Sequence, residues 1–246
     1  MSRVADLKVK IFADGADYDG IVKMSKNALV KGFTTNPTLM RKAGISDYEA
    51  FARKVLAAIP DRPVSFEVFA DDFASMAEQA RTIAAWGSNV NVKIPVTNTK
   101  GQSASELIRA LSSEGIVLNV TAIFTLDQVR TVVDALHPQT AAIVSVFAGR
   151  IADTGVDPIP HMQACKQITA ARPKAELLWA STRELLNIFH AEESGCDIVT
   201  VPNEFLSKLD LVGKDLAEYS RETVQAFYRD ATAAAYQIKI TRVAAE

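Results

Sequence analysis

The sequence predicts an α/β fold in which eight parallel strands close into a single (β/α)8 barrel (a TIM barrel), followed by extra C-terminal helices. Short β-branched or apolar runs alternate with longer amphipathic stretches along the chain, which is the pattern of parallel strands joined by right-handed helical crossovers. The length of 246 residues suits one such barrel, which takes about 250 residues. An open doubly wound sheet is the alternative, but no glycine-rich nucleotide-binding motif follows a strand.

Each element of the barrel is predicted from apolar periodicity and from residues that begin or end helices. The expected strands are Val9–Asp14, Gly32–Asn36, Val64–Phe69, Val90–Pro95, Val117–Ile123, Ala142–Phe147, Leu177–Ser181 and Ile198–Pro202. The clearest helices are Phe73–Trp86 after Asp71 or Asp72, Ala104–Glu114 after Ser103, Leu126–Leu136 after Thr125, and Arg183–Glu193 after Ser181 or Thr182.

The end of the chain is expected to form a helical extension, residues 210–246, of a single barrel domain that covers residues 1–246. The segment Lys214–Ile240 has the pattern of one or two helices. Its apolar residues are Leu216, Tyr219, Val224, Phe227 and Tyr228. They are expected to pack across a barrel mouth or onto a neighbouring subunit.

Composition and charge exclude several classes of function. The formal net charge of −2 gives no electrostatic reason to expect binding to nucleic acid or to an anionic membrane. No apolar run is long enough to span a bilayer, and the N-terminal segment lacks the apolar region of a signal peptide. Cys165 and Cys196 form no disulfide framework. These features predict a cytoplasmic protein.

Polar side chains recur on one face of the predicted strands, near their C-terminal ends. Alternate residues of a strand share a face, so Asn91 lies beside Lys93, and Asn119 beside Thr121. The other members of this set are Asp14, Thr34, Asn36, Ser65, Glu67, Ser145 and Ser181, and the apolar Phe147 shares the face of Ser145. Active sites of these barrels lie at the C-terminal ends of the strands. Because a buried ring of polar groups is unfavourable unless a ligand and the ring satisfy them, it predicts a site.

Lys93 is the centre of this predicted site. A lysine inside a strand cannot readily extend its ammonium group to water, and burial disfavours the charged form. A neutral amine can attack a carbonyl carbon, and the resulting iminium withdraws electrons from a neighbouring C–C bond. The alternative is a lysine paired with a buried carboxylate. The local sequence does not separate the two interpretations, and the surrounding polar ring favours catalysis.

Asp14 and Glu67 are the candidates for the proton transfers that Schiff-base chemistry requires. Asp14 is expected to take a hydroxyl proton from the substrate as the C–C bond breaks. Glu67, through a water held by Thr121, is expected to serve carbinolamine formation and imine hydrolysis. The alternative for Asp14 is a turn residue in an Ala-Asp-Gly-Ala-Asp segment.

Two arginines are candidates for binding an anionic group. Arg150 follows the sixth strand, and Arg183 is expected to open the seventh helix just after Ser181. A pair of guanidinium groups beside the N–H groups of a helix start binds phosphate well. The alternative is that both are solvated surface residues. The histidines lack the spacing of metal ligands, so no metal site is expected.

Several segments follow one another in an order known from one enzyme family. Gly32–Leu39 reads Gly-Phe-Thr-Thr-Asn-Pro-Thr-Leu, and Val92–Thr97 reads Val-Lys-Ile-Pro-Val-Thr. These resemble the Gly-x-Thr-Thr-Asn-Pro signature and the lysine-bearing strand of transaldolases. Further similar segments are Phe66–Val68, Leu118–Ala122, Ser145–Ile151 and Ala180–Ser181. The resemblance runs from about Asp14 to Pro202.

The resemblance implies a reaction and a role for each matched residue. A dihydroxyacetone unit would pass from a ketose phosphate, such as fructose 6-phosphate or sedoheptulose 7-phosphate, to an aldose phosphate, without a metal or organic cofactor. Lys93 would be the nucleophile and Asp14 the acid/base, with Glu67 and Thr121 holding the catalytic water. The implied substrate-binding residues are Thr34, Asn36, Asn119, Ser145 and Phe147, with Arg150, Ser181 and Arg183 for the phosphate.

The family also contains small aldolases that release free dihydroxyacetone and often form rings of subunits. The compact length resembles that branch and implies a homo-oligomer. Those aldolases tend to have Gln at the position of Glu67 and Tyr at that of Phe147, so these two residues favour transfer over aldol cleavage. The segments around Asp14 and Ser181 depart from the family pattern, which leaves the sugar open, within pentose phosphate metabolism or a specialised pathway. A catalytically silent sugar-phosphate-binding barrel is the third alternative.

Overall fold

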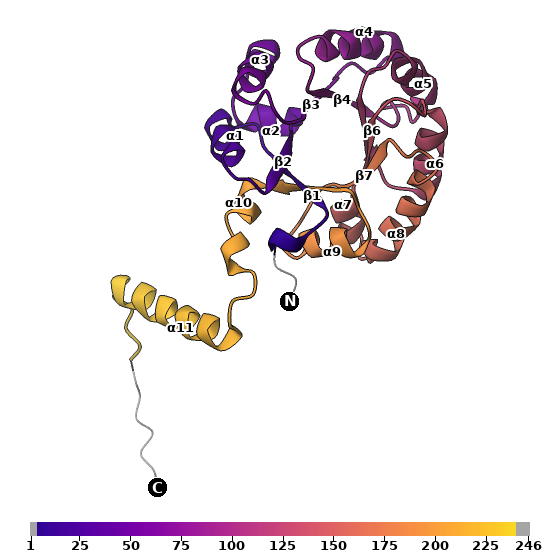
Figure 1. The fold of residues 1–246 in the computed structure, drawn as a ribbon. Helices are drawn as coiled ribbons and strands as arrows, with labels where there is room; N and C mark the ends of the chain where they lie inside the picture. Colours follow the sequence, from indigo (N-terminus) through magenta and orange to yellow (C-terminus); the bar gives the residue numbers. More distant parts are fainter. Residues whose placement is uncertain (1–3, 240–246) are drawn as a thin grey trace. The chain divides into compact units, whose positions relative to one another are not determined.

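Eight strands pair in chain order, and β8 returns to pair with β1, so that the sheet closes into a barrel (Figure 1). The computed structural model describes residues 4–239. The eight pairings that close the barrel are all parallel, and the predicted (β/α)8 fold is confirmed. The strands are β1 (Lys10–Asp14), β2 (Val30–Thr34), β3 (Val64–Glu67), β4 (Val90–Pro95), β5 (Leu118–Ile123), β6 (Ala142–Val146), β7 (Ala175–Trp179) and β8 (Ile198–Pro202).

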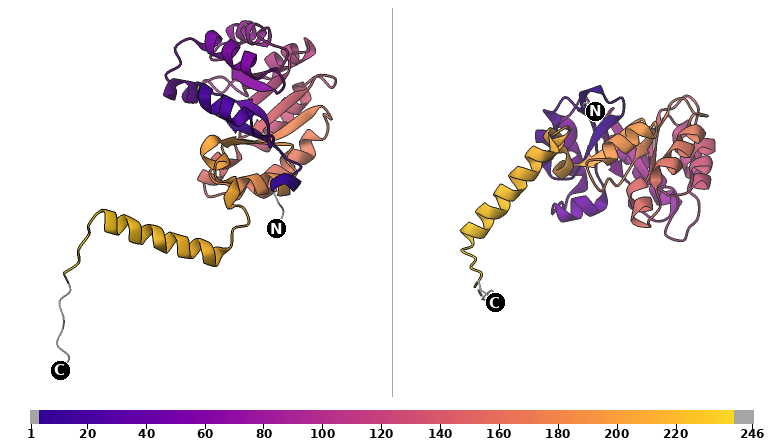
Figure 2. Two further views of the ribbon diagram at one scale, coloured as in Figure 1. Left: turned by 60° about the vertical axis from the view of Figure 1, so that its left-hand side comes forward. Right: turned by 90° about the horizontal axis from the view of Figure 1, so that it is seen from below.

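Helices form a ring outside the strands, which Figure 2 shows from two further directions. They are α1 (Tyr18–Ser25), α2 (Pro37–Lys42), α3 (Tyr48–Ala58), α4 (Phe73–Ala84), α5 (Ser105–Ser113), α6 (Leu126–Ala135), α7 (Ala148–Asp153), α8 (Pro158–Thr169), α9 (Asn187–Glu193) and α10 (Asn203–Leu206). A 3-10 turn, η1 (Val4–Asp6), precedes β1, and a second, η2 (Leu209–Leu211), follows α10 in the chain. Side-chain caps begin many of the helices. Asp72 starts α4, and Thr125 forms a capping box with Gln128 at α6.

Several predicted boundaries are wrong; for example, β3 ends at Glu67 rather than Phe69, and β7 spans Ala175–Trp179 rather than Leu177–Ser181. β2 ends at Thr34 because Asn36 leaves the strand to cap α2. The N-cap position of α5 is Ala104, not Ser103. The helix after the seventh strand begins at Asn187, not at Arg183, because the Asn187 side chain accepts hydrogen bonds from the N–H groups of Arg183 and Glu184, at 2.7 and 3.3 Å, and holds these residues in a turn.

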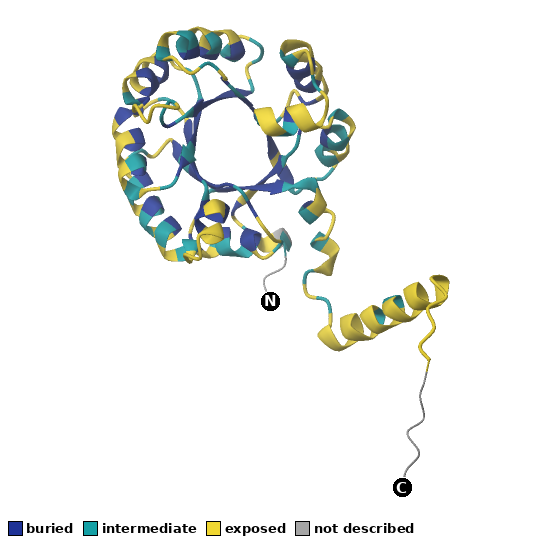
Figure 3. Cartoon of the chain, turned by 180° about the vertical axis from the view of Figure 1, so that it is seen from behind, coloured by how far each residue is buried: buried dark blue, intermediate teal, exposed yellow. Residues whose placement is uncertain are grey.

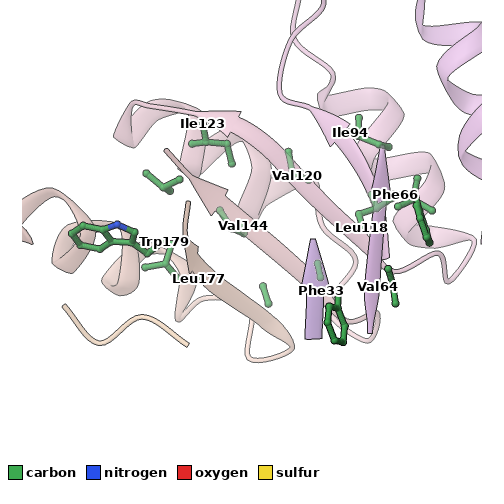
Figure 4. Close-up of a cluster of buried hydrophobic side chains, with 14 of the residues drawn as sticks. Phe33, Val64, Phe66, Ile94, Leu118, Val120, Ile123, Val144, Leu177 and Trp179 are labelled. Atoms are coloured by element: carbon green, nitrogen blue, oxygen red, sulfur yellow. The ribbon is translucent and has the colours of Figure 1, made fainter. Parts of the chain in front are cut away.

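The main core lies between the strands and the helices. Apolar residues on the outer face of the strands, among them Phe33, Phe66, Val120 and Trp179, are fully buried (Figure 4). The helices turn their buried faces toward the strands and their exposed faces to water (Figure 3). Burial at roughly 25 cal/mol per Å² of apolar surface makes this layer the main source of the barrel's stability.

A second apolar cluster fills the inside of the barrel. It consists of Phe12, Ile143, Leu178, Ala180 and Ile198, with Phe147 packed against it. The Phe12 ring lies directly over Gly32, where an added Cβ would be 2.6 Å from a ring carbon. Glycine is therefore the residue that lets this ring occupy the barrel interior. Leu178 and Ala180 also line the cavity described below, so the cluster forms the floor of the site.

The barrel unit ends at Leu209, and the residues from Asp210 onward belong to a second compact unit. Its main element is one helix, α11 (Leu216–Ala233), which Asp215 caps. The predicted segment Lys214–Ile240 therefore holds one long helix in its described part, and residue 240 lies outside the described residues. The five apolar residues predicted for packing are exposed on this chain: Leu216, Tyr219, Val224, Phe227 and Tyr228. Within residues 4–239, no helix is both long and apolar enough to span a membrane.

Candidate active site

A cavity of about 470 Å³ opens among the carboxyl ends of the strands. Every residue given a catalytic or substrate-binding role except Arg183 lines it: Asp14, Thr34, Asn36, Glu67, Lys93, Asn119, Thr121, Ser145, Phe147, Arg150 and Ser181. Asn91 and Ser65 of the predicted polar ring do not line it. Sequence reasoning missed the other lining residues, which are Pro37, Thr38, Leu39, Ala122, Leu178, Ala180 and Thr200. Thr200 could have been predicted by the same rule, because it lies on the opposite face of β8 from its neighbours Val199 and Val201, which belong to the main core.

The Lys93 amine lies in this cavity between two oxygen acceptors. Its Nζ is 2.9 Å from the backbone oxygen of Thr35 and 3.2 Å from Oε2 of Glu67, and the residue is 8% exposed. Glu67 and Lys93 are direct partners in the β3–β4 register, so their side chains leave neighbouring strands on the same face. The buried ion pair considered as an alternative is present. It also places a carboxylate where it can accept the proton that a nucleophilic amine must lose.

Asp14 is joined to two threonine hydroxyls across three strands. The Thr34 hydroxyl donates to Oδ1 of Asp14 at 2.7 Å, and the Thr34 and Thr200 hydroxyl oxygens are 2.5 Å apart. Because Thr34 gives its proton to the carboxylate, Thr200 is the donor in the second bond when Asp14 is ionised. Burial raises the pKa of the Asp14 carboxyl, while the Thr34 hydrogen bond and the nearby Lys93 oppose the rise. A raised pKa makes the carboxylate a stronger base.

We expect Asp14→Asn to raise the melting temperature at neutral pH while it lowers activity. The pKa of Asp14 is raised above its ordinary value of 3.8, so the unfolded chain releases this proton at lower pH than the folded protein does. Ionisation of Asp14 therefore destabilises the fold at neutral pH. Calorimetry should show a gain that shrinks as the pH falls toward 3.8. The exposed carboxylate variant Asp61→Asn is the control, and a gain independent of pH would contradict the assignment.

Amide and hydroxyl groups form a buried chain across the barrel interior. Asn119 donates to the Ser65 hydroxyl at 3.1 Å and accepts from the Ser145 hydroxyl at 2.6 Å. The Asn36 side-chain oxygen caps α2 through the Leu39 N–H, at 2.9 Å. An amide NH2 group has two donors, so Asn36 and Asn119 each keep N–H capacity for a ligand in the cavity.

The two arginines occupy different places. Arg150 lines the cavity from α7, with its guanidinium 5.0 Å from the centre of the Phe147 ring. Arg183 does not line the cavity; it forms a two-pronged ion pair with Asp153, with its Nε 2.9 Å from Oδ1 and one terminal nitrogen 2.5 Å from Oδ2. Arg183 also does not lie at a helix start. It links the loop after β7 to the end of α7.

Two non-glycine residues at the cavity wall have left-handed backbones. Ala122 has φ 61° and Ser181 has φ 63°, a region that favours glycine and whose strain often accompanies functional sites. Ala122 coincides with a shift in the β5–β6 register. Ser181 brings its carbonyl against Gly149, where an added Cβ would be 1.5 Å from the oxygen. The wall thus combines a strained loop with a close backbone contact.

Comparison with known proteins decides the family. A family model described as transaldolase/fructose-6-phosphate aldolase matches residues 11–246. The chain belongs to this family. The resemblance of its sequence motifs to transaldolases is therefore confirmed. The match covers the barrel from β1 onward and includes the α11 segment.

Curated members of the transaldolase/fructose-6-phosphate aldolase family resemble the chain over most of its length. A probable transaldolase from Dehalococcoides mccartyi is 38% identical over 205 residues, which are 82% of this chain and 90% of that protein. Probable transaldolase 2 from Listeria monocytogenes is 36% identical over 202 residues, 82% of this chain and 88% of that protein. A solved structure of 3-hexulose-6-phosphate synthase from Salmonella typhimurium has a TM-score of 0.55 and 16% identity, covering 90% of this chain and 99% of that one. That likeness shows the fold alone.

Proposed function

We propose that this chain is a transaldolase, which moves a dihydroxyacetone unit between sugar phosphates through a Schiff base on Lys93. The observation that carries the proposal is the buried Lys93 amine, 3.2 Å from the Glu67 carboxylate in a cavity that Asp14 also lines. Family membership and the names of its relatives support the same reaction. A site that merely binds a sugar phosphate does not require an amine and two carboxylates together.

The chemistry follows from the positions of these groups. Glu67 accepts a proton from the Lys93 ammonium, and the free amine attacks the ketose carbonyl carbon. The carbinolamine loses water, with Glu67 and Thr121 handling that water, to give a protonated imine. Asp14 then takes the proton of the hydroxyl on the carbon beyond the bond to be broken, the C–C bond electrons move into the iminium, and an aldose phosphate leaves. The remaining enamine attacks the carbonyl carbon of an acceptor aldose phosphate, and the steps reverse.

The other lining groups supply substrate binding in this proposal. Asn36, Asn119 and Ser145 would hold sugar hydroxyls, with Thr34 fixing the Asp14 carboxylate. Arg150 and Ser181 would hold the phosphate. Arg183 would join them by exchanging Asp153 for the phosphate, since their ion pair is exposed, with side chains 47% and 50% accessible. An exposed pair contributes only about 0–1 kcal/mol, so a phosphate dianion can compete for the guanidinium.

The test is to trap the Schiff base. The protein is incubated with fructose 6-phosphate and borohydride, and intact and peptide masses are measured. A reduced dihydroxyacetone adduct on Lys93 is the expected result. If fructose 6-phosphate gives no adduct, a panel of ketoses and ketose phosphates is tried next. Failure across the panel would overturn the proposal and favour a silent sugar-phosphate-binding barrel.

Phe147 favours transfer over free aldol cleavage in this proposal. Its ring lines the cavity and packs 5.7 Å from Phe124, centre to centre. We expect Phe147→Tyr to raise the ratio of dihydroxyacetone release to transfer by about tenfold, or ~1.4 kcal/mol, because a phenol can bind the water that hydrolyses the intermediate. Rates with and without an acceptor aldose phosphate measure the ratio. Phe124→Tyr is the control, and an unchanged ratio in Phe147→Tyr would contradict this assignment.

We also propose a homo-oligomer, with residues 210–246 as a helical extension of the barrel domain that contacts another copy. The exposed apolar side chains of α11, such as Val224 and Phe227, support it, because large exposed apolar patches mark interaction surfaces. Sedimentation velocity of the full chain tests this proposal, and a monomer at micromolar concentration would contradict it. The buried free thiols of Cys165 and Cys196 support a cytoplasmic location, which subcellular fractionation tests.

A further inference from the structure

The β2–β3 ladder stops one step before it reaches Glu67. Thr35 N–H donates to the Ser65 oxygen at 3.2 Å, and Phe33 N–H donates to the Pro63 oxygen at 2.9 Å. In a parallel ladder the backbone groups of alternate residues face the same neighbour. The next step would therefore join Glu67 N–H to the Thr35 oxygen, and the Glu67 oxygen to the N–H of residue 37.

Neither of these two ladder bonds is made. The Thr35 oxygen accepts instead from the Lys93 ammonium, at 2.9 Å. Residue 37 is proline, which has no N–H group to donate. The last residue of β3 is thus left without a strand partner on its β2 side, although backbone polar groups that are even partly buried need hydrogen bonds.

The Tyr48 hydroxyl takes the place of both missing partners. It accepts from Glu67 N–H at 2.7 Å and donates to the Glu67 oxygen at 2.9 Å. A phenol can do both because it has one donor and one acceptor site. Tyr48 is the first residue of α3, and its N-cap Asp47 accepts from Ala50 N–H. Burial raises the pKa of Tyr48, which keeps the hydroxyl proton available.

Aromatic neighbours fix the Tyr48 ring in this position. Its centre lies 5.2 Å from that of Phe69, 5.6 Å from that of Trp86 and 6.2 Å from that of Phe66, and both phenylalanine contacts are edge-to-face. Such pairs are worth about 0.5–1.5 kcal/mol each beyond the area they bury. The phenol is therefore a rigid support for the end of β3.

We infer that Tyr48 is a positioning residue, which holds the backbone of Glu67 so that its carboxylate meets the Lys93 amine. On the other side of β3, Val68 N–H is bonded to the Lys93 oxygen at 3.1 Å. The end of β3 is thus held by hydrogen bonds to β4 on one side and to Tyr48 on the other. Removal of the phenol hydroxyl eliminates both hydrogen bonds on the Tyr48 side. The consequence for catalysis rests on the proposed function, in which Glu67 moves the protons of imine formation.

The test compares Tyr48→Phe with Tyr18→Phe. Tyr18 is also the first residue of its helix after an aspartate cap. Its ring contacts the Lys54 amine, 3.8 Å from the ring centre, and not the end of a strand. Single-turnover borohydride trapping measures the rate of adduct formation on Lys93. Tyr48→Phe should slow it by roughly 10- to 100-fold, since a small misplacement of a reacting group has this order of effect, with little change in KM. Tyr18→Phe should leave it unchanged.

A double variant separates positioning from a general loss of structure. If Tyr48 acts through Glu67, then Tyr48→Phe should add almost no further loss in a Glu67→Gln background, because the two residues act as one unit. An equal further loss in that background would overturn the inference. A trapping rate within about twofold of the wild type in the single variant would overturn it as well.

A crystal structure of Tyr48→Phe without ligand supplies a readout that does not depend on the reaction. It should show the Glu67 carboxylate out of hydrogen-bond range of the Lys93 Nζ. If the wild type forms no adduct while Glu67 moves away in the variant, the proposed function fails and the positioning role stands. If Glu67 stays in place, the positioning inference fails.

Discussion

Replacing Lys93 by methionine is expected to reduce transfer activity by at least about 10⁴-fold, the scale seen when a catalytic nucleophile is removed. Methionine keeps the length and apolar character of the side chain but lacks the amine, so no imine can form. The borohydride adduct should disappear together with the activity. Initial rates with fructose 6-phosphate and an acceptor aldose phosphate, and the intact mass after borohydride, measure the two effects.

The Lys93→Met protein must be shown to fold, because the Glu67 carboxylate loses its ionic partner at 3.2 Å. An uncompensated buried charge is destabilising, so circular dichroism and the melting temperature accompany the assay. Lys100→Met removes an exposed lysine after β4 and should leave activity unchanged. Full activity in folded Lys93→Met would exclude a Schiff-base mechanism on Lys93.

Replacing Gly149 by alanine is expected to damage both stability and substrate binding. The added Cβ would be 1.5 Å from the Ser181 carbonyl oxygen and 2.6 Å from its carbonyl carbon. Because backbone atoms cannot turn aside as a side chain can, α7 and the loop after β7 must separate. Overpacking of this kind costs about 3 kcal/mol or more, which corresponds to a fall in melting temperature of roughly 6–12 °C.

The same displacement moves Arg150 away from Ser181, so KM for the sugar phosphate should rise at least about tenfold. Thermal unfolding and steady-state kinetics measure the two effects. Gly87→Ala is the matched control, since its Cβ would meet only side-chain atoms, the nearest being the Asn89 oxygen at 3.2 Å and a Leu56 methyl carbon at 3.4 Å. A Gly149→Ala protein with wild-type melting temperature and KM would show that the two segments are not held together as described.

The barrel and most of the site residues could be predicted because both depend on strand periodicity. The alternation that places Asn91 and Lys93 on one face of β4 also gathers Asn119 and Ser145, and the same rule applied to β8 gives Thr200. Interactions between distant segments have no such period. The ion pair of Arg183 with Asp153 spans 30 residues, and either residue alone reads as an ordinary surface charge.

The backbone conformation of the cavity wall was also not predictable from the sequence. Ala122 and Ser181 adopt left-handed conformations at positions that carry no glycine, so the usual signal for such a turn is absent. The sequence also contained no signal for the Thr35 carbonyl as the partner of Lys93, because every residue type has the same backbone carbonyl oxygen. This contact depends on where the hydrogen bonds between β2 and β3 end, which is a property of the folded backbone.

The apolar cluster around Phe12 fills the barrel beneath the cavity, and in the proposed reaction this sets the order in which the two substrates enter and leave. A donor sugar enters at the carboxyl ends of the strands and cannot be pushed out through the far end. The aldose phosphate that it releases must leave through the same opening before an acceptor of similar size can enter. Donor, released product and acceptor therefore compete for a single entrance, and each turnover is an exchange of one aldose phosphate for another.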